Sequence, residues 1–176
     1  MALLCLEALE EAAKESSSAG RFINPSKIEG ERRMRFIGEG ITGYMGWNTD
    51  NKPERFEQKP SELPANIKVE SGSAPLKRFF ANLVYDFETD DFKIFEWTQK
   101  TITEQVHKFM KDEDYGDPTL YDIKLSRTGE GLKTEYSLVA APPKSVSKSV
   151  QDRYDNFYCN LNALYDGEDP FSDPTA

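Results

Sequence analysis

The stretch that decides the fold is Lys77-Arg78-Phe79-Phe80-Ala81-Asn82-Leu83-Val84-Tyr85-Asp86-Phe87. Every second residue from Phe79 to Phe87 is apolar, so in an extended chain these side chains share one face. This alternation predicts a strand with one face in the core. The acidic turn at 88–91 and the apolar run at 92–97 then predict a second strand that completes a hairpin.

Further strands are predicted on both sides of this hairpin. The run Arg32-Arg33-Met34-Arg35-Phe36-Ile37 alternates and ends at Gly38. Residues 121–126 also alternate, and Gly129-Glu130-Gly131 turns the chain into 132–139, which predicts a second hairpin. Residues 52–75 contain four prolines and many charges, so we expect a long excursion between strands.

Helices are expected between the hairpins and at both ends. Ile102, Val106 and Phe109 have the spacing of a helix packed on a sheet. Residues 1–20 predict a short amphipathic helix on a tether, which packs on the body or on a second copy of the chain, or serves as a dedicated partner helix. Residues 149–165 predict a C-terminal helix, followed by an acidic mobile tail at 166–176. Residues 21–148 are the body.

These elements predict a single domain of the mainly β class, a small closed barrel with peripheral helices. The chain of 176 residues has a net charge of −9. Residues 1–20 carry −3 and residues 149–176 carry −5, which leaves −1 on the body, so a locally basic face can form there. No membrane-spanning segment or secretory signal is evident, and we expect a cytoplasmic protein.

Three ordered motifs resemble one protein family. They are the run from Lys93 to Ile102 (KIFEWTQKTI), the run from Tyr115 to Ile123 (YGDPTLYDI), and Arg127-x-Gly129-Glu130-Gly131-x-x-Thr134-x-Tyr136. In this order they resemble the single-stranded DNA-binding proteins of tailed bacteriophages, and the likeness covers roughly residues 32–158. The resemblance implies a five-stranded oligonucleotide/oligosaccharide-binding (OB) barrel that coats replicating or recombining DNA without catalysis.

Two known features of that family are not expected here. Members related to the phage helix-destabilising protein bind zinc through His and Cys, but this chain has one His and two Cys. They also use a basic N-terminal arm for cooperative binding, whereas this N-terminus is acidic. We therefore predict no zinc site, no other cofactor and no strong cooperativity, and we expect each cysteine to be a small core residue.

Binding a single strand without sequence preference requires cations along the phosphates and flat side chains on which bases stack. Arg78 and Phe80 share the strand face opposite the apolar one and are the best candidate pair. Trp47 follows a glycine-rich run and precedes a polar turn, where an indole is harder to bury. The alternative is that the aromatic residues are core and the basic residues only solvated. The candidate DNA-binding residues are Arg33, Arg35, Tyr44, Trp47, Lys77, Arg78, Phe80, Lys93, Trp97, Lys100, Lys124, Arg127 and Lys133.

The tail segment Asp169-Pro170-Phe171 resembles the acidic Pro-Phe tails by which bacterial single-stranded DNA-binding proteins recruit partners. The resemblance implies that these residues bind phage or host replication and recombination proteins. A tethered anion also competes with DNA phosphates for the same cations, so we expect the tail to act as a self-inhibitory mimic of DNA. The alternative is a solvated terminus with no role.

Other functional classes fit less well. Asp86-Phe87-Glu88-Thr89 and His107 with Asp112 resemble motifs of metal-dependent 3′-5′ exonucleases, but the 18 residues between Glu88 and His107 cannot hold the rest of such a domain. No nucleophile has an evident base, and the glycine pattern at 38–43 is expected to be a loop. We predict no catalytic residues. The main rival is a phage accessory module that binds proteins rather than DNA.

Overall fold

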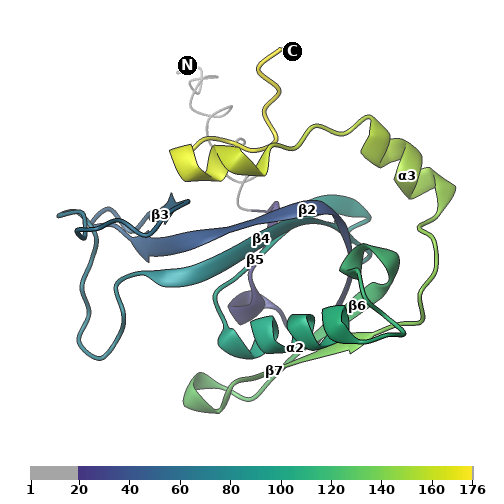
Figure 1. The fold of residues 1–176 in the computed structure, drawn as a ribbon, viewed down its shortest axis with the longest axis horizontal. Coiled ribbons are helices and arrows are strands. Elements are labelled where there is room, and N and C mark those ends of the chain that lie inside the picture. Colours follow the sequence, from purple (N-terminus) through teal and green to yellow (C-terminus); the bar gives the residue numbers. More distant parts are fainter. Residues whose placement is uncertain (1–19, 176) are drawn as a thin grey trace, which may run out of the picture.

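The computed structural model describes residues 20–175, which form one strongly curled, mainly antiparallel sheet with few helices (Figure 1). The mainly β prediction is confirmed. The predicted N-terminal helix lies outside the described residues. The strands are β1 (Phe22–Ile23), β2 (Glu31–Trp47), β3 (Pro53–Phe56), β4 (Lys77–Asp86), β5 (Asp91–Trp97), β6 (Asp122–Thr128) and β7 (Glu135–Ala140).

The strand order is β1-β5-β4-β2-β6-β7, and β3 also pairs with β2. Of the strand pairs in the described part of the chain, only β1–β5 is parallel. Within residues 20–175, no ladder joins β7 to β5 or β1. The sheet is therefore an open half-barrel, and the closed barrel predicted from the sequence is not formed by hydrogen bonding.

Strand β2 is 17 residues long and pairs with three other strands. The prediction that this strand ends at Gly38 is wrong, because the chain continues through the glycines. Gly38 has a φ of 65°, and the β2–β4 register shifts between Ile37 and Ile41, which marks a bulge where the strand bends. A Cβ on Gly43 would lie 2.2 Å from the carbonyl oxygen of Phe56. The glycines therefore allow the bend and the close approach of β3.

The inner face of the curled sheet is covered by α2 (Lys100–Lys111). Ile102 and Val106 of this helix pack on Phe36, Phe95 and neighbouring apolar residues, as the helical spacing predicted. The Gln105 side chain also donates to the Tyr136 carbonyl and accepts from the Leu138 amide, which ties α2 to β7. The short helices η1 (Pro25–Lys27), η2 (Pro118–Leu120) and η3 (Gly131–Lys133) complete this half of the fold.

The outer face of the sheet is covered by the C-terminal segment, which crosses it above β2 in Figure 1. Two short helices take the place of the single predicted helix at 149–165, namely α3 (Lys148–Asp155) and η4 (Leu161–Asp166). Leu161 and Leu164 pack on Phe79, Ala81 and Ile94. The hydroxyl of Tyr165 donates to the Thr42 carbonyl over 2.7 Å.

The acidic tail continues this cover, at least as far as Phe171, and is not free of the body. Pro170 is buried, and its carbonyl accepts a hydrogen bond from the Asn160 amide. The Phe171 ring packs edge-on against Phe157, and the Arg21 guanidinium lies 4.5 Å from its centroid. The mobility predicted from composition stays a prediction, and the contacts of Pro170 and Phe171 are the interactions that would oppose it.

Cys159 lies beneath this cover, partly buried, in contact with the outer-face core. Burial raises the pKa of its thiol to about 11. The thiol is therefore protonated at neutral pH and behaves as a small apolar side chain. Cys5 lies outside the described residues.

Candidate nucleic-acid interface

Two buried carboxylates bind several of the basic residues that the sequence predicts as DNA contacts. Asp122 accepts hydrogen bonds from Arg33 Nε over 2.9 Å and from Arg35 Nε over 2.7 Å, and Arg35 is only 1% exposed. Asp86 binds Arg32 Nε over 3.0 Å, and Lys93 Nζ lies 3.5 Å from it. Arg33, Arg35 and Lys93 therefore hold strands together in this structure, and Arg35 is not on the surface.

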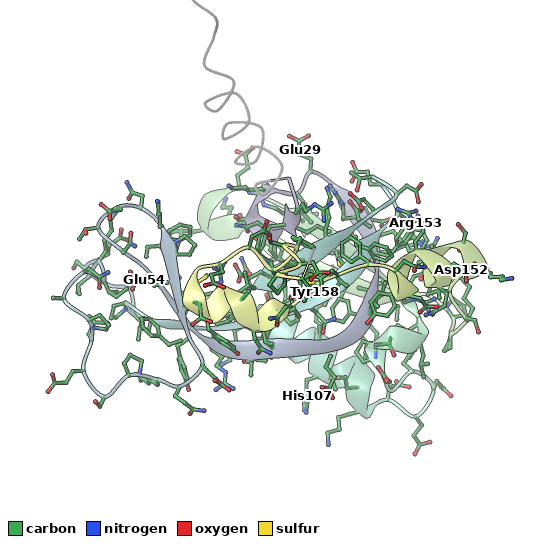
Figure 2. All side chains as sticks on the ribbon, turned by 90° about the horizontal axis from the view of Figure 1, so that it is seen from above. Glu29, Glu54, His107, Asp152, Arg153 and Tyr158 are labelled. Atoms are coloured by element: carbon green, nitrogen blue, oxygen red, sulfur yellow. The ribbon has the colours of Figure 1, made fainter. Side chains whose placement is uncertain are left out.

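The same geometry explains the exonuclease-like motif. The carboxylate of Asp86 is fully buried and also accepts from the Thr89 hydroxyl, while Glu88 pairs with Arg32. His107 is exposed on α2, at the edge of the molecule (Figure 2). In the described part of the chain, no group of three His, Cys, Asp or Glu residues is placed to hold a metal ion.

Asp86 makes stability dependent on pH. Burial alone would raise its pKa, but hydrogen bonds from Arg32 and Thr89 and the charge of Arg32 outweigh burial and hold the pKa below the ordinary 3.8. A carboxyl whose pKa is lower in the folded state stabilises the fold above its unfolded pKa and loses that contribution as pH falls through the folded pKa. We therefore expect the wild-type protein to lose its stability advantage over Asp86→Asn below about pH 4. Urea unfolding of both proteins at pH 7 and pH 3 measures this, and an advantage that is constant with pH would contradict it.

The register of β2, β4 and β5 brings four of the predicted DNA contacts together with Thr42 in one cluster. Tyr44 pairs with Arg78, and Phe80 pairs with Thr42 on one side and with Trp97 on the other. Directly paired residues share a face of the sheet, so all five side chains lie on the inner face. Arg78 donates to Thr42 Oγ1 over 2.9 Å and to the Tyr44 hydroxyl over 3.1 Å.

Within this cluster the guanidinium lies over aromatic rings. Arg78 Cζ is 5.2 Å from the Tyr44 centroid and 5.9 Å from the Phe80 centroid. Phe80 in turn stacks on Trp97, with centroids 5.4 Å apart and an angle of 16° between the rings. Trp97 is 6% exposed, and its indole donates to Thr103. The buried Trp97 ring therefore packs against the core side of Phe80. Arg78 is exposed, and Tyr44 and Phe80 are partly exposed.

An apolar groove of about 540 Å³ extends from Phe80 between the sheet and α2. Gly38 and Gly40 form part of its wall, and a Cβ on Gly40 would lie 2.7 Å from the Ala81 carbonyl oxygen. Met110 on α2 lies on the opposite side and is 55% exposed. Flat apolar ligands are the kind that such a surface accommodates.

A second hollow, of about 430 Å³, lies at the end of the same β2–β4 ladder. Trp47 lines it, is 51% exposed, and is accompanied by Lys68 and Lys77. The Lys68 amide donates to the Trp47 carbonyl over 2.8 Å, which fixes the excursion at 52–75 against the strand. Glu70 also lines this hollow, so its charges are mixed. An exposed indole with cations nearby can stack on a base while the cations bind phosphates.

Four further predicted cations, Lys100, Lys124, Arg127 and Lys133, lie elsewhere on the fold. Lys100 is exposed at the start of α2, 3.8 Å from Glu104. Lys124 pairs with Arg33 across the β2–β6 ladder. Arg127 and Lys133 flank the β6–β7 turn, where the buried Nε of Arg127 has no hydrogen-bond partner within residues 20–175.

Two parts of this site were not predicted. Lys68 and Thr42 lie beside the aromatic residues only because of strand register and the fold of the excursion, and neither has a sequence signal. The paired carboxylates Asp86 and Asp122 could have been suspected, because each ends or begins an apolar strand where an unpaired charge would be unfavourable.

Comparisons with protein-family models, curated proteins and solved structures give no match to this chain. Among the described residues, no helix is long and apolar enough to cross a membrane.

Proposed function

We propose that the chain binds single-stranded DNA without strong sequence preference, as a non-catalytic protein of phage replication or recombination in the cytoplasm of an infected bacterium. The observation that carries this proposal is the inner-face cluster of Arg78, Tyr44 and Phe80, which combines a cation with stacking surfaces. Trp47 and Lys77 line a separate hollow at the end of the same ladder, and the alternation of β2 and β4 places them on the other face of the sheet. No metal ion or cofactor is part of the proposal.

The proposal includes an OB-type arrangement of the curled sheet. Counting β2, β4, β5, β6 and β7 as its five strands, α2 connects the third to the fourth. OB folds bind oligonucleotides on the face of strands two and three and with the loops between strands one and two and between four and five. Phe80 and Trp97 lie on the second and third strands, Lys68 lies in the first of these loops, and Lys133 lies in the second.

A single strand fits this surface better than a duplex does. Stacking on Trp47 or Phe80 requires bases whose faces are exposed, and base faces in a duplex are covered by their neighbours. The groove beside Phe80 is mostly apolar, so the phosphates would lie outside it, near the exposed Arg78 whose guanidinium is 5.9 Å from the Phe80 centroid. The acidic segment Asp169-Pro170-Phe171 covers the outer face, and recruitment of partners through it would require it to detach.

A titration of single-stranded and duplex oligonucleotides at two salt concentrations tests the proposal. We expect clear preference for the single strand. If about four phosphates are neutralised, the logarithm of the affinity should fall against the logarithm of salt with a slope near −3, from about −0.7 per phosphate. Equal affinity for duplex, or an affinity that ignores salt, would contradict DNA binding and favour the protein-interaction module.

Substitutions test the site itself. Trp47→Ala and Phe80→Leu are expected to weaken binding by about 1–3 kcal/mol, because each removes a stacking surface. Arg78→Ala should weaken binding to all sequences alike and lower the salt slope. Phe87→Ala is the matched control, since Phe87 is exposed at the other end of β4. If binding responds equally to Phe87→Ala, the site is misplaced even though DNA binding stands.

A further inference from the structure

A cavity of about 570 Å³ lies where β2, η2 and α3 meet. Arg35 and Gly38 of β2, Thr119 of η2 and Tyr154 of α3 line it. It adjoins the apolar groove, because Phe36, Gly38 and Thr119 line both hollows. The predicted DNA contacts other than Arg35 do not contribute to its walls.

Hydrogen bonds fix the segment that closes the cavity. The Ala141 amide donates to the Asp122 carbonyl over 2.9 Å, and the Lys144 amide donates to the Leu120 carbonyl over 3.0 Å. Ser147 caps α3 by accepting from the Val150 amide, and Val150 is buried. The cavity is therefore a defined feature of the fold and not a gap beneath a loose loop.

Two charged side chains of the described residues line the cavity, Arg35 and Lys144, and both are cations. Asp122 lies beside Arg35 but also binds Arg33, so one carboxylate faces two guanidinium groups. The ion cluster keeps an excess positive charge next to the cavity. A hollow with low-dielectric walls and an excess of one charge concentrates ligands of the opposite charge.

The guanidinium of Arg35 is only partly used by the protein. Its Nε binds Asp122, and its Nη1 donates to the Thr119 carbonyl over 3.3 Å. Its Nη2 is buried and has no partner among the described residues. An unpaired buried donor is unfavourable, and the planar fork of arginine matches the oxygens of a phosphate.

The other lining groups suit a phosphate attached to a flat or apolar body. Ser145 and Tyr154 bring hydroxyl groups, while Ile37, Leu120 and Val146 form apolar walls. The volume is larger than a free phosphate needs and lies in the usual range for small-molecule sites. We propose that this cavity binds the phosphate monoester of a nucleotide, either a free nucleotide or the phosphorylated end of a strand.

The experiment uses the full chain and calorimetric titration with thymidine monophosphate and with thymidine. The monophosphate is expected to bind at least tenfold more tightly, because only it carries the charge that Arg35 and Lys144 recognise. A titration with oligothymidine carrying a 5′-phosphate or a 5′-hydroxyl separates the two sources of the phosphate. Preference for the phosphorylated strand assigns the site to strand ends, and its absence assigns the site to free nucleotides.

Matched variants locate the binding. Lys144→Ala and Ser145→Asp should each weaken binding of the monophosphate by about tenfold. The first removes a charged hydrogen-bond donor, and the second places a carboxylate that repels the phosphate. Lys148→Ala and Ser149→Asp place the same changes on exposed residues outside the cavity and should have no effect. Arg35→Lys keeps the charge but removes the fork, and should also weaken binding.

Equal affinity for thymidine and its monophosphate would overturn the proposal, and so would equal effects of the cavity variants and their controls. Because the side chains of Lys144 and Ser145 are exposed, the test does not depend on Arg35→Lys being stable. The proposal also does not rest on single-stranded DNA binding. A variant that loses monophosphate binding but keeps single-stranded DNA binding, or the reverse, would show that the two sites act independently.

Discussion

Asp122→Ala is expected to destabilise the protein by about 3–5 kcal/mol, the range found when one partner of a buried ion pair is removed. The loss arises because the two arginines that bind Asp122 would be left without its carboxylate. Arg33 is 38% exposed at its side chain and can turn to solvent, but Arg35 is 2% exposed and cannot. Its charge would stay buried with only the Thr119 carbonyl as a hydrogen-bond partner. Urea unfolding monitored by circular dichroism measures the loss.

An exposed ion pair is the control for this prediction. Lys100 and Glu104 lie four residues apart on α2, and both are largely exposed. Glu104→Ala is expected to change stability by no more than about 0.5 kcal/mol. The double variant Arg35→Met with Asp122→Leu removes both charges and should recover much of the stability that Asp122→Ala loses. A loss as small as that of Glu104→Ala would show that the Asp122 cluster does not hold β2 to β6.

The strands and α2 follow from local sequence patterns. The period of two in residues 77–87 correctly assigned Phe79 and Phe80 to opposite faces, because alternation needs no information about the neighbouring strand. The helical spacing of Ile102 and Val106 likewise identified the side of α2 that packs on the sheet. In contrast, the length of β2 depends on glycines that have no pattern of their own and act through close contacts with β3 and β4.

The candidate site was less predictable, because it depends on pairing between distant residues. Arg33 and Asp122 are 89 positions apart, and nothing local distinguishes this arginine from the exposed Arg78. Trp97 faces inward only in the register that pairs it with Phe80. Basic and aromatic residues were therefore identified by type, and strand register decides which of them form a surface and which form the core.

Removal of residues 161–176 is expected to abolish stable folding of the remaining chain. Leu161, Ala163 and Leu164 are buried on the outer face, and each fully buried leucine contributes about 1.5–3 kcal/mol. Their loss would also expose Phe79 and Ile94, which are fully buried in the intact protein. The total exceeds about 5 kcal/mol, the lower end of the stability of a whole domain. Loss of the cooperative unfolding transition and binding of a hydrophobic dye measure this result.

Shorter deletions separate this structural role from the predicted mimicry of DNA. Removal of 172–176 leaves Pro170 and Phe171 in place and should not alter stability. Removal of 166–176 also takes away the Phe171 ring that packs on Phe157 and Arg21, and should cost about 1–3 kcal/mol, since the ring is only partly buried.

Measuring DNA affinity of the same two deletions at low salt decides between the roles. If the tail only covers the outer face, the affinity of the folded protein stays unchanged, because Arg78 and Phe80 lie on the opposite face of the sheet. Tighter DNA binding after removal of 166–176, together with unaltered stability, would instead identify the tail as a competitor of DNA. The two outcomes are exclusive, because one segment cannot be fixed by its contacts on the outer face and at the same time occupy the inner-face cluster.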